Sequence, residues 1–207
     1  PPPRLLAMLH HTAALAHLQC GDWDQANSRF KKAIQVCNLS KDNQCLSILL
    51  RSRAEIDLLW GNFKEAEQNF RAALNVVLQR RQEEEHQAIL RGIAELSMTN
   101  AETIGGLSLL DQAQALEGTA IEEANCLVVQ AGLLIMRGKL DKAKAVLELS
   151  EQLGAQCPLL QANQMRRRAE ISLHLRRYEE GIRFGIFALQ NYIRTGKRIA
   201  EGSTYRL

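Results

Sequence analysis

Three histidines near the N-terminus are the residues best suited to chemistry in this sequence. His10 and His17 are two helical turns apart, so a helix would place both roughly on one face, and His11 lies beside them. A zinc site needs three or four ligands at suitable spacing, and no third ligand is evident here. We therefore interpret these imidazoles as packed or groove-facing side chains and predict no metal site.

A cysteine–histidine nucleophile is the second chemistry to consider. Cys20 or Cys45 could pair with a histidine, but neither lies in an orienting motif or beside a loop that could stabilise an oxyanion. The sequence also lacks a P-loop and a dinucleotide fingerprint, and the isolated pair Gly105-Gly106 is not a phosphate loop. We predict a protein that is not an enzyme and has no catalytic residue, no cofactor and no small-molecule substrate.

The C-terminal end of the chain is basic. The net charge is +3, but residues 160–207 hold ten Lys and Arg against four Asp and Glu. The basic residues that we single out are Arg166, Arg167, Arg168, Arg176, Arg177, Arg183, Arg194, Lys197 and Arg198. A solvated helix face is the simplest interpretation. Binding of nucleic acid, phosphate or an acidic partner at this end stays open as the alternative.

The composition indicates a helical protein outside the membrane. The chain is 46% hydrophobic and only 5% aromatic, and residues 4–157 contain no proline, which excludes an all-β domain rich in turns. No apolar run approaches the roughly 18 residues of a membrane helix, and no secretory signal is visible. The five cysteines form no C-x-x-C pair. We expect reduced thiols and a cytoplasmic or nuclear location.

An internal repeat explains the helical character. Residues 21–26, 61–66 and 138–143 share the order Gly, polar, large apolar, two polar, Ala, and residues 176–181 are a weaker copy. Small residues recur at spacings of 40, 40, 37 and 38: Ala33, Ala73, Ala113, Ser150 and Ala188. We predict a single array of five units at about 4–40, 41–80, 81–119, 120–157 and 158–198. Because the chain begins at Pro1 and ends abruptly at Leu207, we also expect a fragment of a longer protein.

Each unit has the pattern of a helical hairpin. Its first half is apolar at helical spacing, the glycine allows the left-handed conformation that ends a helix, and the alanine lets two helices approach closely. A lone hairpin cannot bury its apolar faces, so the units must stack. The third unit has Thr99-Asn100-Ala101 in place of the glycine and contains Gly105-Gly106. We expect a bend or a mobile loop there.

This pattern resembles the tetratricopeptide repeat over about residues 7–193, although the units are longer than the usual 34 residues and lack the proline between them. The resemblance implies a right-handed α-solenoid of about five stacked antiparallel hairpins. It also implies a non-catalytic scaffold that binds other proteins or peptide segments, with the first helices lining the concave side.

The resemblance places eight residues on that concave face: His11, Arg51, Glu55, Arg91, Glu95, Val128, Arg166 and Glu170. Three units repeat Arg and Glu four residues apart, which puts the pair on one side of a helix. The pairs either interact within their helices in solvent or form a charged ladder that orders a partner segment. The glutamates would repel a terminal carboxylate, which argues against the family's carboxylate-clamp members that bind chaperone C-termini.

A second resemblance rests on three short stretches: Ala94-Glu95-Leu96, Thr103-Ile104 and residues 109–116. They are similar to the repeats of subunit 5 of the anaphase-promoting complex, which would imply a structural subunit of a large nuclear ubiquitin ligase with a role in the cell cycle. A cohesin-loader subunit or a signalling adaptor with similar long repeats remains an alternative.

Overall fold

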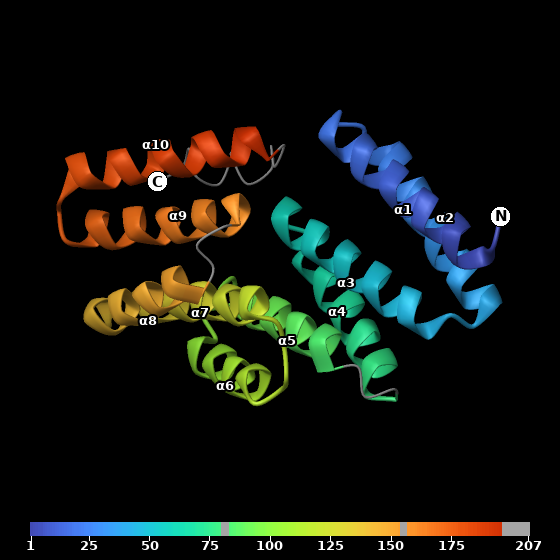
Figure 1. Cartoon of the computed structure of the whole chain (residues 1–207), viewed down its shortest axis with the longest axis horizontal. Coiled ribbons are helices and arrows are strands. Elements are labelled where there is room, and N and C mark those ends of the chain that lie inside the picture. Colours follow the sequence, from blue (N-terminus) through green and yellow to red (C-terminus); the bar gives the residue numbers. More distant parts are fainter. Residues whose placement is uncertain (80–82, 154–156, 196–207) are drawn as a thin grey trace. The chain divides into compact units, whose positions relative to one another are not determined.

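The computed structural model describes residues 1–79, 83–153 and 157–195. Within these ranges the regular secondary structure is entirely α-helical (Figure 1). The helices are α1 (Pro3–Gln19), α2 (Trp23–Ser40), α3 (Asn43–Trp60), α4 (Phe63–Leu78), α5 (Glu83–Ser97), α6 (Thr103–Gln114), α7 (Ala120–Met136), α8 (Leu140–Leu153), α9 (Pro158–His174) and α10 (Tyr178–Arg194). The chain divides into two compact units, unit 1 (Pro1–Gly92) and unit 2 (Ile93–Leu207), and the division falls within α5.

Local signals set the helix boundaries. Asp22, Asp42 and Thr119 each accept a backbone N–H from the residue three positions later, which satisfies a free donor of the first helical turn. Helices α1 and α9 begin at Pro3 and Pro158, where the missing N–H costs nothing. The two helices of a hairpin then pack side by side, as Figure 1 shows for α1 with α2 and for α9 with α10.

A left-handed residue closes the turn inside every predicted hairpin. The five residues with positive φ at this place are Gly21, Gly61, Ala101, Gly138 and Arg176. Their spacings are those of the sequence repeat, 40, 40, 37 and 38. The third and fifth turns therefore adopt the same conformation without glycine, although a side chain makes the left-handed region less favourable by about 1–2 kcal/mol.

The expected bend at Gly105-Gly106 is wrong. Both residues lie inside α6, and Gly106 is buried at the place where other units have Ala26, Ala66 and Ala143. A Cβ on Gly106 would collide with Ser97 Oγ and crowd Leu133, so the missing side chain lets α6 approach its neighbours. The glycine is the small residue of the repeat and does not interrupt the helix.

Unit 1 buries small and apolar side chains between its hairpins. One cluster joins Ala33 and Cys37 of α2 to Cys45 and Leu49 of α3. A polar contact lies beside it: Arg53 of α3 donates to Asn27 of α2 at 2.6 Å and pairs with the buried Asp57 at 3.0 Å. The Arg53 guanidinium also lies 5.1 Å from the ring centre of Trp23, which stacks on Trp60.

Unit 2 is joined in the same way. Its largest cluster packs Ala143 and Leu147 of α8 against Leu160 and Ile171 of α9, together with α7. Arg168 of α9 pairs with Glu151 of α8 through two bonds of 2.6 Å. Gln164 of α9 donates to Ser150 of α8 at 2.9 Å. Consecutive hairpins are therefore held by apolar packing together with a few polar pairs.

No helix of the described residues is long and apolar enough to span a membrane. The five cysteines, Cys20, Cys37, Cys45, Cys126 and Cys157, are all free thiols.

Candidate functional site

Four side chains of unit 1 form an ion-pair network between α3 and α5. Arg51 donates to Glu85 at 2.7 Å and to Glu55 at 2.8 Å, and Arg91 donates to the same oxygen of Glu55 at 3.2 Å. The predicted residues Arg51, Glu55 and Arg91 are thus brought together. They pair between helices as well as within α3, so the network links the first helices of two consecutive hairpins.

The network holds its charges at neutral pH and stays within reach of solvent. Burial alone would raise the pKa of Glu55, but Arg51 and Arg91 outweigh it and keep that pKa below its usual value. The side chain of Arg51 is 21% exposed and that of Glu55 is 33% exposed. A partner segment could therefore reach the network without opening the helix pair.

His11 extends the same face to α1. Its Nε2 lies 2.9 Å from Ser52 Oγ on α3, and its ring lies 5.6 Å from that of Phe30. Burial, together with the nearby Arg51 charge, lowers the pKa of His11, so the ring is neutral at neutral pH.

In unit 2 the corresponding glutamate is held by an arginine that the sequence analysis did not place at the site. Arg167 donates to both oxygens of Glu170, at 3.0 and 2.8 Å, and its side chain is only 5% exposed. Its guanidinium lies against the backbone of Gly132, where a Cβ would be 2.6 Å from Cζ. Nη2 also reaches Met98 Sδ at 3.8 Å. Arg167 therefore extends from α9 across α7 toward the end of α5.

The other charged residues predicted in unit 2 act on one buried tyrosine. Burial raises the pKa of Tyr192, Arg166 and Arg167 oppose that rise, and Glu95 and Glu170 add to it. Tyr192 donates to Asn163 at 2.6 Å. The charges of Glu95, Arg166 and Glu170 therefore act on the same buried part of unit 2.

Val128 does not contribute to an accessible face. Its side chain is buried in the cluster that α7 forms with α8 and α9. We therefore remove Val128 from the candidate site. The signal for Arg167 was present in the sequence: Gly132 stands where the neighbouring units have Glu95 and Glu170, which leaves room for a side chain from the next hairpin.

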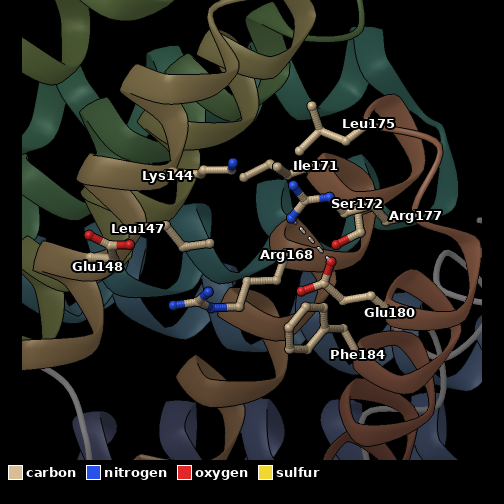
Figure 2. Close-up of a pocket in the computed structure, with 10 residues that line it drawn as sticks. All are labelled: Lys144, Leu147, Glu148, Arg168, Ile171, Ser172, Leu175, Arg177, Glu180 and Phe184. Atoms are coloured by element: carbon tan, nitrogen blue, oxygen red, sulfur yellow. Dashed lines mark ion pairs between the residues drawn. The ribbon is translucent and has the colours of Figure 1, made fainter.

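A small pocket of about 60 Å³ lies between α8, α9 and α10 (Figure 2). Lys144 and Glu148 line one side, and Arg177 and Glu180 face each other at 3.8 Å on another. Arg168 lies 5.8 Å from the ring centre of Phe184. Pockets for small ligands usually hold about 300–1,000 Å³, so this space at the junction of two hairpins is smaller than a usual ligand pocket.

The histidines occupy separate surroundings. His10 lies 3.5 Å from Arg29, and His17 lies 3.7 Å from Asp22. Across the part of the chain that the structure describes, no three His, Cys, Asp or Glu side chains come together as metal ligands.

Part of the basic C-terminal end is already neutralised. Arg167, Arg168 and Arg177 pair with Glu170, Glu151 and Glu180. Lys197 and Arg198 lie outside the described residues.

Comparison with known proteins identifies the repeat. Residues 5–79, which comprise α1 to α4, match the family described as tetratricopeptide repeat. These two hairpins are tetratricopeptide repeats. Proteins of this repeat family bind other proteins or peptides, and the fold is typically a non-catalytic scaffold.

A solved structure shows the same fold beyond these two repeats. The chain is similar to the crystal structure of BtubC (BKLC) from P. vanneervenii with a TM-score of 0.69 and 15% identity, over 97% of this chain and 82% of that one. The match supports a tetratricopeptide-like helical repeat fold and says nothing of partners. No curated protein matches the sequence, so the resemblance to subunit 5 of the anaphase-promoting complex is not confirmed.

Proposed function

We propose that the chain is a non-catalytic interaction scaffold that binds a peptide segment of another protein on the first-helix face of unit 1. The observation that carries the proposal is the ion-pair network of Arg51, Glu55, Glu85 and Arg91. It is formed before a partner arrives, so binding would cost the scaffold little ordering entropy. Because it presents both signs of charge, it suits a segment carrying an acidic and a basic side chain.

A peptide-library selection followed by calorimetry tests this proposal. The double variant Arg51→Glu/Arg91→Glu should weaken the selected peptide by at least ~10-fold, since it replaces attraction by like-charge repulsion. Arg71→Glu is the matched control, because Arg71 is an exposed arginine of α4 away from the network. If the wild type, the double variant and Arg71→Glu bind the selected peptide with equal affinity, the first-helix face of unit 1 is excluded as the binding site. The second helices would then be tested next.

Two narrower functions have less support. Binding of nucleic acid at the basic end would have to compete with the carboxylates that already pair with Arg167, Arg168 and Arg177. A steep fall in binding with added salt would be its signature. No contact between these helices supports a role in a ubiquitin ligase, a cohesin loader or a signalling complex.

A further inference from the structure

The outward face of α10 is apolar where the preceding second helix is polar. Ile182 is 59% exposed. In repeat register it corresponds to Asn27 of α2 and Lys144 of α8, which are half-buried beside the following hairpin. Ile182 therefore occupies the side of the second helix on which a following hairpin packs.

A gap lies in the same face at Gly185. The equivalent residues of the other four repeats are large and buried: Phe30, Phe70, Leu110 and Leu147. A Cβ added to Gly185 would meet no atom within 4 Å. The face thus combines the exposed Ile182 with open space at Gly185, where an apolar side chain of an incoming helix could pack.

The outward face of α1 has the complementary property. Leu5 and Leu9 are 52% and 55% exposed. They correspond in register to Cys45 and Leu49 of α3, which are buried against α2. Helix α1 therefore exposes the positions that a first helix uses to pack on a preceding second helix.

The polar pairs between hairpins support a match between these two faces. Polar pairs that join a second helix to the next first helix include Arg53 with Asn27 and Arg168 with Glu151. Both arginines correspond to Ala13 of α1, and their partners correspond to Ile182 and Leu189 of α10. At the positions of these polar pairs, both open faces therefore carry apolar side chains: Ala13 on α1, and Ile182 and Leu189 on α10.

We propose that α1 of one molecule packs on α10 of a second copy, head to tail, in the arrangement by which α3 packs on α2 and α9 on α8. Such a contact joins two different surfaces, so each copy keeps one surface available for a further copy. Only a few half-exposed side chains contribute on each side, whereas a stable complex usually buries ~800 Å² per partner. We therefore expect weak association that depends on concentration.

Analytical ultracentrifugation across ~10–300 µM tests the proposal. The weight-average mass of the wild-type chain should rise with concentration, while Leu9→Glu and Ile182→Glu should each remain monomeric. Ile104→Glu is the matched control, because Ile104 is an exposed isoleucine of α6 outside both faces, and it should associate as the wild type does. Circular dichroism should show unchanged helicity, since each replaced side chain is exposed.

Mixing the two monomeric variants gives the decisive result. Leu9→Glu retains an intact α10 face and Ile182→Glu an intact α1 face, so the mixture should form a one-to-one dimer that grows no further. A monomeric wild type, self-association of Leu9→Glu alone, or failure of the mixture to pair would each overturn the proposal. Arg51→Glu/Arg91→Glu should self-associate normally, which separates this result from the test of peptide binding.

Discussion

Glu55 of unit 1 and Glu170 of unit 2 occupy the same repeat position, yet their arginine partners differ in origin and exposure. Glu55 is shared by Arg51 and Arg91 in a network that solvent can reach. Glu170 is held by Arg167, which is almost completely buried against Gly132. The comparison indicates that one repeated charge can lie within reach of solvent in one unit and be packed in the other, depending on what the neighbouring helix leaves open.

The largest effect should come from removing the buried arginine. Arg167→Ala leaves Glu170 largely buried without its main partner, and breaking such a pair typically costs about 3–5 kcal/mol. Urea denaturation should show this loss of unfolding free energy, whereas the exposed Arg183→Ala should change it by less than about 0.5 kcal/mol. Arg167→Met/Glu170→Met should recover most of the loss, because no unpaired charge remains. A small change in unfolding free energy for Arg167→Ala would mean that the pair of Arg167 and Glu170 does not stabilise the fold.

Filling the space at Gly132 should have the next largest effect. Gly132→Ala places a Cβ against the Arg167 guanidinium, and overpacking of this kind costs about 1–3 kcal/mol. Arg167→Ala should make the same substitution almost harmless in a double-mutant cycle. Additive losses would show that the two residues do not interact as described.

The network of unit 1 should matter less for stability. Arg51→Ala should lower the unfolding free energy by about 1 kcal/mol or less, since partly exposed pairs gain little over solvation. The same substitution should weaken a selected peptide far more than it weakens the fold. A loss of unfolding free energy as large as that of Arg167→Ala would show that Arg51 stabilises the fold as strongly as Arg167 does.

Lowering the pH should destabilise unit 1 before unit 2, and this should be the smallest of the predicted effects on stability. The lowered pKa values of His10, His11 and His86 mean that the folded chain resists protonation, so their contribution is present above about pH 6.5 and is lost as pH falls. Glu55, whose pKa is also lowered, adds a loss below about pH 4.5. Hydrogen exchange between pH 7 and 5 should show α1 and α3 losing protection before α9, and His11→Asn should reduce that difference. Equal loss in both units would contradict the assignment.

The hairpins were predictable because their determinants are local. A glycine that ends one helix and an alanine five residues later recur along the chain. The glycines have positive φ and the alanines are buried, as the pattern predicts. The third turn lies at Thr99-Asn100-Ala101 as predicted, but the bend expected in that unit was wrong, because Ala101 adopts the left-handed conformation without glycine and Gly106 is a small contact residue inside α6. Backbone strain of this kind is balanced by tertiary packing, which a repeat pattern does not report.

The candidate site was predictable only in part. Helical spacing paired Arg51 with Glu55, but the bonds to Glu85 and from Arg91 depend on how α5 lies against α3. Arg166 and Arg167 are neighbours in sequence, and their different burial depends on the space that Gly132 leaves on another helix. Side chains that reach between helices require the packed arrangement before their partners can be named.

Nuclear magnetic resonance of the arginine side chains, with and without a peptide selected for binding, tests the distinction between the two units most directly. The Nε–H signals of Arg51 and Arg91 should shift as peptide is added, because these groups lie on the binding face. The Arg167 signal should exchange slowly with water and keep its position, because the guanidinium is buried. A peptide that shifts Arg167 and leaves Arg51 and Arg91 unchanged would contradict the account.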